Sequence, residues 1–132
     1  MALKLEQQPG ITVTRTANAA LASPYRFVMP ISGTPENVKQ VDAANAEALG
    51  LIDQKYNQGD PVKVILGGIA IVEAGAAVAV DDKIVTDASG RGVPKGSTAT
   101  THYKVQGKAL SAASAAGELF AMEVAKHDFY QA

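Results

Sequence analysis

The sequence contains no cysteine and no tryptophan, and aromatic residues make up only 5% of its 132 residues. Without cysteine, the chain cannot form a disulfide framework, a thiolate zinc site or a thiol nucleophile. So few aromatic side chains also leave little material for the aromatic-lined cleft that a sugar-cleaving pair of carboxylates would need. The composition therefore argues against several common kinds of site.

Charged residues are scarce as well. They form 19% of the chain, and the formal net charge is −1, with a pI of about 6.1. This balance provides no long-range attraction to nucleic acid or to an anionic membrane. The longest apolar stretch, residues 62–80, is interrupted by Lys63, Glu73 and glycines, so no membrane-spanning helix is predicted. Residues 1–10 lack the apolar core of a secretory signal. Nucleic acid and membranes are not expected partners.

The motifs that could bind phosphate or a cation have simpler interpretations as turns. Residues 89–96, SGRGVPKG, resemble a phosphate-binding loop, but the lysine precedes the final glycine and no helix is predicted to follow. Asp81, Asp82 and Asp87 lack the spacing of a helix–loop–helix calcium site. We expect all of these residues in turns between strands.

The candidate nucleophiles and metal ligands are isolated from one another. His102 and His127 are the only histidines, and neither has a second histidine or an acid at metal-ligand spacing. Ser111 and Ser114 lie in an alanine-rich segment without the glycine pattern of a nucleophile elbow. We therefore predict that the protein is not an enzyme, with no catalytic residue, no cofactor and no metal site.

The abundant residues are small and β-branched apolar ones, since 47% of the chain is hydrophobic, mostly alanine and valine. Short runs of such residues alternate with turn residues at intervals typical of an all-β domain. The sequence predicts a mainly β fold, a small β-barrel or sandwich-like domain. The expected strands cover residues 11–16, 25–31, 38–41, 49–52, 62–66, 69–73, 83–87, 104–110 and 119–124.

Three other segments complete the predicted organisation. Residues 42–49, DAANAEAL, favour one or two short helical turns, because Asp42 can cap a helix and the alanines have high helix propensity. Residues 93–103 are polar and are expected to form an exposed loop. We divide the chain into an extended N-terminal arm with the first strand (1–17), one β-rich domain (18–126) and a C-terminal tail (127–132).

The centre of the predicted domain is the stretch 49–80, in which two β-type runs flank Gly67-Gly68. The glycine pair permits a tight reversal or a bulge. Residues 49–65 have a weak echo in residues 106–123, which suggests two related hairpins. The side chains expected in the core are Val64, Leu66, Ile71, Phe120 and Met122.

The candidate contact residues lie near the N-terminus. The segment Ile11–Thr16 alternates apolar or basic residues with three threonines, which is typical of a strand with one face toward solvent or a partner. We expect this segment to contact another protein, either a different chain or a second subunit. The predicted contact residues are Ile11, Thr12, Val13, Thr14, Arg15 and Thr16.

A series of short motifs follows in order over about two-thirds of the chain. They are GLI at 50–52, QGDPV at 58–62, GGI at 67–69, EAGAA at 73–77, DKIVTD at 82–87, SGRG at 89–92, GKAL at 107–110 and ASAAGEL at 113–119. This ordered series resembles the small capsid decoration, or cement, proteins of tailed bacteriophages.

The resemblance implies a structural protein of the virion, made in the bacterial cytoplasm. It would bind the major capsid protein on the outer surface of the capsid, often as a homotrimer, and would cement the mature head. The alternatives are another virion building block, such as a tail-tube or head–tail connector subunit, or a small non-catalytic ligand-binding β-module.

Overall fold

The computed structural model describes residues 7–132, and all of the regular structure in this range is β. The prediction of a mainly β fold is therefore confirmed. The strands are β1 (Gln8–Ala17), β2 (Phe27–Ile31), β3 (Thr34–Gln40), β4 (Gly50–Leu51), β5 (Pro61–Glu73), β6 (Lys83–Thr86), β7 (Gly92–Pro94), β8 (Thr101–Ala109) and β9 (Leu119–Gln131).

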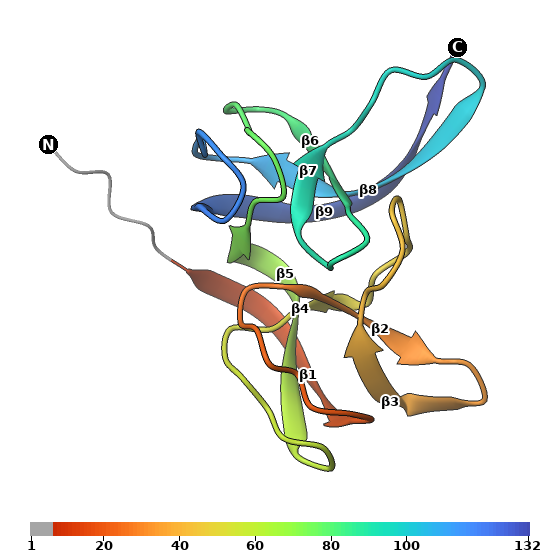
Figure 1. Ribbon diagram of the computed structural model, residues 1–132, viewed down its shortest axis with the longest axis vertical. Coiled ribbons are helices and arrows are strands. Elements are labelled where there is room, and N and C mark those ends of the chain that lie inside the picture. Colours follow the sequence, from red (N-terminus) through yellow and green to blue (C-terminus); the bar gives the residue numbers. More distant parts are fainter. Residues whose placement is uncertain (1–6) are drawn as a thin grey trace, which may run out of the picture.

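The first five strands form a closed circuit of pairings. Their order is β1–β3–β2–β4–β5, and β5 returns to pair with β1 in antiparallel fashion. The pairing of β1 with β3 is parallel and short, at Thr16 and Ala17. These strands make up the lower half of the molecule in Figure 1. We call this circuit unit A.

The last five strands repeat the same circuit, and we call it unit B. β5 pairs with β9, β9 with β8, β8 with β6, and β6 with β7. A parallel bridge between Ala74, just after β5, and Gly92 in β7 closes the circuit. Unit B lies in the upper half of Figure 1. β5 therefore serves as the last strand of unit A and the first strand of unit B.

The two units match in their backbone contacts and in one sequence motif. Residues 17–22, ANAALA, recur as residues 74–79, AGAAVA. The N–H of Ala17 donates to the carbonyl of Asp60, and the N–H of Ala74 donates to that of Glu118. The bridge between Leu21 and Tyr56 likewise corresponds to the bridge between Val78 and Ala113. The echo noted in the sequence is thus part of a structural repeat that extends from β1 to β9 in the described residues.

Each unit encloses its own apolar core. In unit A, β1, β2, β3 and β5 supply side chains that pack with those of the connecting loops: Val13, Ala17, Leu21, Val28, Val38, Leu49, Ile52, Tyr56, Val62, Val64 and Leu66. The matching positions of unit B lie in the largest core cluster, which also takes in Phe27, Leu51 and Ile65 from unit A. This shared cluster joins the two units by apolar packing.

The glycine pair at 67–68 is a bulge and not a reversal, since β5 continues through it from Pro61 to Glu73. Gly68 has a φ of +86°, and the register with β1 shifts beside it, near Ile11. A side chain at Gly68 would collide with the backbone of Gln8 and Gly10. The bulge allows one strand to leave the sheet of unit A and enter that of unit B.

The predicted core is largely confirmed. Val64, Phe120 and Met122 are fully buried, and Leu66 packs against the core of unit A. Ile71 is only half-buried, so its assignment to the core is wrong. Its neighbours Ala70 and Val72 point into the core instead, because successive side chains of a strand alternate between faces.

The predicted helical turn at Asp42–Leu49 is wrong, because this segment forms an irregular strap, with a turn at residues 44–45, that packs against unit B. The side chain of Asn45 accepts the N–H of Lys104 at 2.8 Å and donates to the carbonyl of His102 at 2.9 Å. The N–H of Ala46 donates to the Thr86 hydroxyl at 2.9 Å. The Lys126 ammonium donates to the carbonyls of Ala48 and Leu49. These tertiary bonds satisfy polar groups that a two-turn helix would satisfy only in part.

The C-terminal half of the chain is more regular than predicted. β9 runs to Gln131, through the segment assigned to a tail, and β8 begins at Thr101, inside the predicted loop. These extensions pair with each other from Thr101↔Gln131 to Val105↔His127. The short strand β7 was not predicted, since Gly92 and Pro94 read as turn residues.

Equivalent glycines give a test of the repeat. A methyl group at Gly50 would collide with the carbonyl oxygen of Ile65, and one at Gly107 would collide with that of Glu123. We expect Gly50→Ala and Gly107→Ala each to lower the free energy of unfolding by about 1–3 kcal/mol, measured by urea denaturation.

Gly67→Ala is the matched control, since its added methyl would meet Ile11 only at ordinary contact distances of 3.8 Å or more. If all three variants were equally stable, the two glycines would not be the close strand contacts described here.

Candidate functional site

Residues 7–132 contain no pocket and no cluster of three or more histidine, cysteine, aspartate or glutamate side chains placed to hold a metal ion. In the same residues, no helix is long and apolar enough to cross a membrane. The features that remain to be described are polar networks and strand edges.

The acids singled out in the sequence stabilise turns. The Asp87 carboxylate accepts the N–H groups of Ser89 and Arg91 at 2.9 and 2.8 Å and forms an ion pair with the Arg91 guanidinium. The Asp82 carboxylate accepts the N–H of Ala79 at 2.8 Å. Residues 87–91 therefore form the turn between β6 and β7, whereas Gly92–Pro94, which was also expected in a turn, is strand β7.

The two histidines lie on the hairpin formed by β8 and β9. The His102 ring contacts the ring of Tyr130, with centroids 4.7 Å apart. The Nδ1 of His127 lies 3.1 Å from the carbonyl oxygen of Ala125 in the same strand. Neither histidine faces a carboxylate or a nucleophile within hydrogen-bond distance in the described residues.

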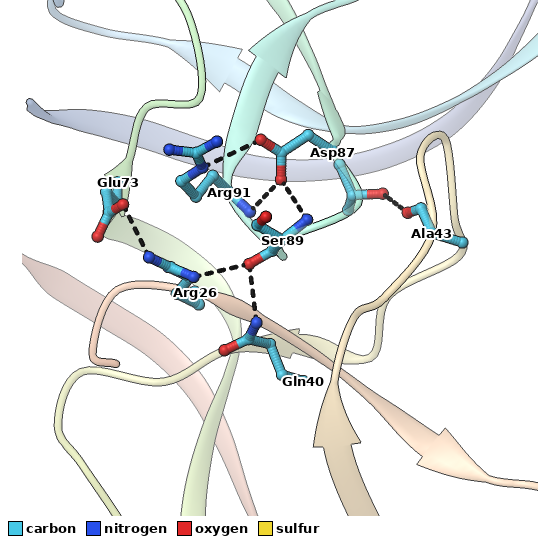
Figure 2. A network of polar contacts seen from close by, with 8 residues as sticks. Arg26, Gln40, Ala43, Glu73, Asp87, Ser89 and Arg91 are labelled. Carbon is cyan, nitrogen blue, oxygen red and sulfur yellow. Dashed lines mark hydrogen bonds and ion pairs between the residues drawn. The ribbon is translucent and has the colours of Figure 1, made fainter. Parts of the chain in front are cut away.

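Figure 2 shows a polar network at the join between the two units. The Arg26 guanidinium donates to the Ser89 carbonyl and to the Glu73 carboxylate, both at 3.0 Å. The Gln40 amide donates to the same Ser89 carbonyl at 2.9 Å. Arg26 and Gln40 belong to unit A, whereas the turn at Ser89 belongs to unit B. Because the ion pair is mostly buried, with side chains 18% and 20% exposed, we interpret the network as a fastening between units.

Three titratable groups are perturbed, each for a local reason. Hydrogen bonds from the Ser114 hydroxyl and N–H lower the pKa of Glu118, and hydrogen bonds from Thr98 lower the pKa of Tyr103. Burial beneath the strap lowers the pKa of Lys126, an effect that the nearby Glu47 opposes. The partners of these groups lie in turns, a loop and the strap, so the shifts reflect structural bonds.

The predicted contact segment Ile11–Thr16 lies within β1. One edge of the strand is paired with β5 throughout, and its other edge meets β3 only at Thr16 and Ala17. Thr12, Thr14 and Thr16 are exposed, and Ile11 is 63% exposed. Val13 packs against the core of unit A. The segment is thus anchored in the domain and offers a row of threonines and part of a free edge. Residues 1–6 of the predicted arm lie outside the described residues.

Comparison with known protein families identifies the family of this chain. The family model described as "Phage cement protein" matches residues 5–125. This chain belongs to the phage cement protein family. Cement proteins are structural components of the bacteriophage head, so the chain is a virion protein associated with the capsid. No curated protein sequence matches it.

A solved structure shares the fold of this cement protein. It is described as the head fiber gp8.5 N base in bacteriophage phi29. The TM-score is 0.68 at 22% identity, and the match covers 87% of this chain and 93% of that one. The likeness shows that the whole two-unit body, and not one unit alone, is common to both proteins.

The sequence reasoning missed the second exposed strand of this cement protein. The predicted strand ended at residue 124, and residues 127–132 were assigned to a tail, whereas β9 continues to Gln131. The aromatic pair Phe129 and Tyr130 was the available signal. Phe129 turns inward beneath the Lys95 ammonium, 4.3 Å from its ring centroid, and Tyr130 turns outward.

The Glu118 turn allows a titration test. We expect Ser114→Ala to raise the pKa of Glu118 toward its usual value, because the variant removes the hydroxyl donor and leaves the backbone donor. The pKa can be read from the side-chain carboxyl carbon by NMR.

The lowered pKa of Glu118 stabilises the fold above the unfolded-state pKa, and this contribution is lost as the pH falls through the folded-state value. The wild type should therefore exceed Ser114→Ala in stability at neutral pH, with a gap that narrows in acid. Ser97→Ala, in a distant loop, should leave the Glu118 pKa unchanged. An unchanged pKa in Ser114→Ala would contradict this assignment.

Proposed function

We propose that this cement protein binds the outer surface of the capsid as a homotrimer and stabilises the mature head. Its partner would be the major capsid protein, at or near three-fold positions of the lattice. The observation that carries the proposal is the family match over residues 5–125. The likeness of the whole body to a head-fiber base is consistent with it.

The physical reason for a trimer is multivalent attachment. DNA packed in the head pushes neighbouring capsid subunits apart, so a protein that binds several subunits at once opposes their separation. After the first contact, each further contact of a trimer is intramolecular, and modest single contacts then add up to tight binding. A closed three-fold assembly uses the same contact surface three times.

The segment Ile11–Thr16 is our candidate for contact with the capsid or with a neighbouring subunit. It combines exposed threonines with a strand edge that is free up to Arg15 within the described residues. Such an edge can add backbone hydrogen bonds to a partner strand.

A binding experiment tests the proposal. The molar mass of the purified protein is measured by light scattering. The protein is then mixed with mature capsids that lack it, and the capsids are imaged by electron microscopy. We expect a trimer and added density on the outer surface at three-fold positions. A protein that never sediments with capsids would overturn the proposal, and a ring of six would favour a tail-tube or connector subunit.

Head stability provides a separate prediction. Capsids with the bound protein should release their DNA at a higher temperature, and after a stronger osmotic shock, than capsids without it. DNA release can be followed with an intercalating dye during heating. Equal release from both preparations would remove the cementing role while leaving the binding role intact.

A further inference from the structure

The two longest strand edges without a strand partner in the described residues lie one near each terminus. In β9, the stretch Ala125–Gln131 pairs with β8 on one edge, whereas β5 covers the other edge only as far as Val124. In β1, the stretch Gln8–Arg15 pairs with β5 on one edge and with no described strand on the other. Open edges of this length favour association with another strand unless they are covered.

The internal repeat indicates which strand suits the open edge of β9. By the equivalence of the units, Ala125–Gln131 corresponds to Gly67–Glu73 of β5. At Ile69, β5 pairs with β1 and with β9 at once, so these two strands lie on opposite edges. The open edge of β9 is the same edge that pairs with β5 up to Val124. In unit A, the equivalent edge of β5 pairs with β1 as far as Ile69. A β1 strand is thus the partner that the chain already uses at the equivalent place.

Both open-edge strands carry an exposed apolar side chain. Ile11 on β1 is 63% exposed, and Tyr130 on β9 is 53% exposed. Cross-strand pairs between an aromatic and a β-branched residue stabilise sheets, so pairing these strands would cover both side chains. The two edges lie on different sides of the molecule, β1 in the lower half of Figure 1 and the end of β9 at its upper right. A copy can therefore use both edges at the same time, with one neighbour on each.

We propose that the open edge of β9 pairs with the open edge of β1 in a second copy of this chain, and that repetition of this head-to-tail contact closes the trimer. The inference rests on the trimer of the proposed function and names its interface. A head-to-tail contact is heterologous, so it closes into a ring when the rotation between copies is one third of a turn.

Disulfide trapping tests the contact, and the natural absence of cysteine makes the readout clean. Thr12 and Asp128 lie near the middle of the two open stretches and are exposed, so they approach each other whichever way the strands run. We expect one of two double variants to give covalent trimers on oxidation. The first is Thr12→Cys/Asp128→Cys. The second is Thr12→Cys/His127→Cys, in which the cysteine on β9 lies on the opposite face of the strand. Cross-linking in only one of the pairs is expected, because a cross-strand disulfide needs both side chains on one face.

Single-cysteine variants distinguish the head-to-tail contact from its rivals. Thr12→Cys alone and Asp128→Cys alone should stay uncross-linked, since each brings its cysteine next to a residue that is not cysteine. Covalent dimers from Thr12→Cys alone would indicate a two-fold pairing of β1 with β1 and would overturn the proposal. A trimer in which neither double variant cross-links would also overturn it.

Substitution of the two exposed apolar residues provides a second test. We expect Ile11→Ser and Tyr130→Ser each to raise the dissociation constant of the trimer at least tenfold, measured by sedimentation at several concentrations. Val80→Ser is the matched control, because Val80 is 55% exposed but lies on neither strand, and its trimer should be unchanged. Equal behaviour of all three variants would overturn the proposal.

Capsid binding by the wild type is measured separately, so the two proposals fail in different ways. Trimers that bind capsids but do not cross-link would leave the proposed function standing and remove only this interface. Cross-linked trimers that do not bind capsids would support this interface and contradict the proposed capsid binding.

Discussion

The rest of this structure depends on one strand that belongs to two closed circuits of hydrogen bonds. β5 completes the sheet of unit A with its first half and begins the sheet of unit B with its second half. Backbone N–H and C=O groups must be paired wherever they are buried, so a strand shared in this way fixes the position of both units. The crossing requires glycine at position 68, since Gly68 adopts a positive φ and a Cβ there would collide with the backbone of Gln8 and Gly10. The join needs no linker, and its surroundings, the Arg26 network and the strap at 42–49, restrain the units further.

The composition follows from that arrangement. Two small closed circuits have little internal volume, which valine and alanine fill more readily than tryptophan would. Strands that close on themselves also approach each other tightly at Gly50 and Gly107, where any side chain would meet a carbonyl group of the neighbouring strand. The scarcity of aromatic residues and the regular glycines are therefore consequences of the same geometry.

The strand pattern was predictable from the sequence to a large extent, because alternation and turn residues are local signals. Val64, Phe120 and Met122 were assigned to the core for this reason, and all three are fully buried. The strap at 42–49 was not predictable, since its alanines favour a helix and only the distant backbone of β8 decides otherwise. The length of β9 was underestimated because Ala125–Gln131 is polar and gains its strand conformation from β8. At the candidate site, Ile11–Thr16 was recognised as a strand, whereas the second exposed strand near the C-terminus required the topology.

Because the two units share a strand, the places where strands of another molecule can pair with the sheet are restricted. Inside the chain, the first strand of unit B and the last strand of unit A are one element, so the join leaves no edge between the units. Within the described residues, β1 and β9 each belong to one unit only, so neither is shared in the way that β5 is. The longest stretches of strand edge without a strand partner in these residues therefore lie on β1 and β9. A protein of the phage head must assemble with copies of itself or with the capsid without spreading into filaments. Placing its two longest open edges on different sides of the body limits the ways in which copies can join, and head-to-tail closure would satisfy both edges at once.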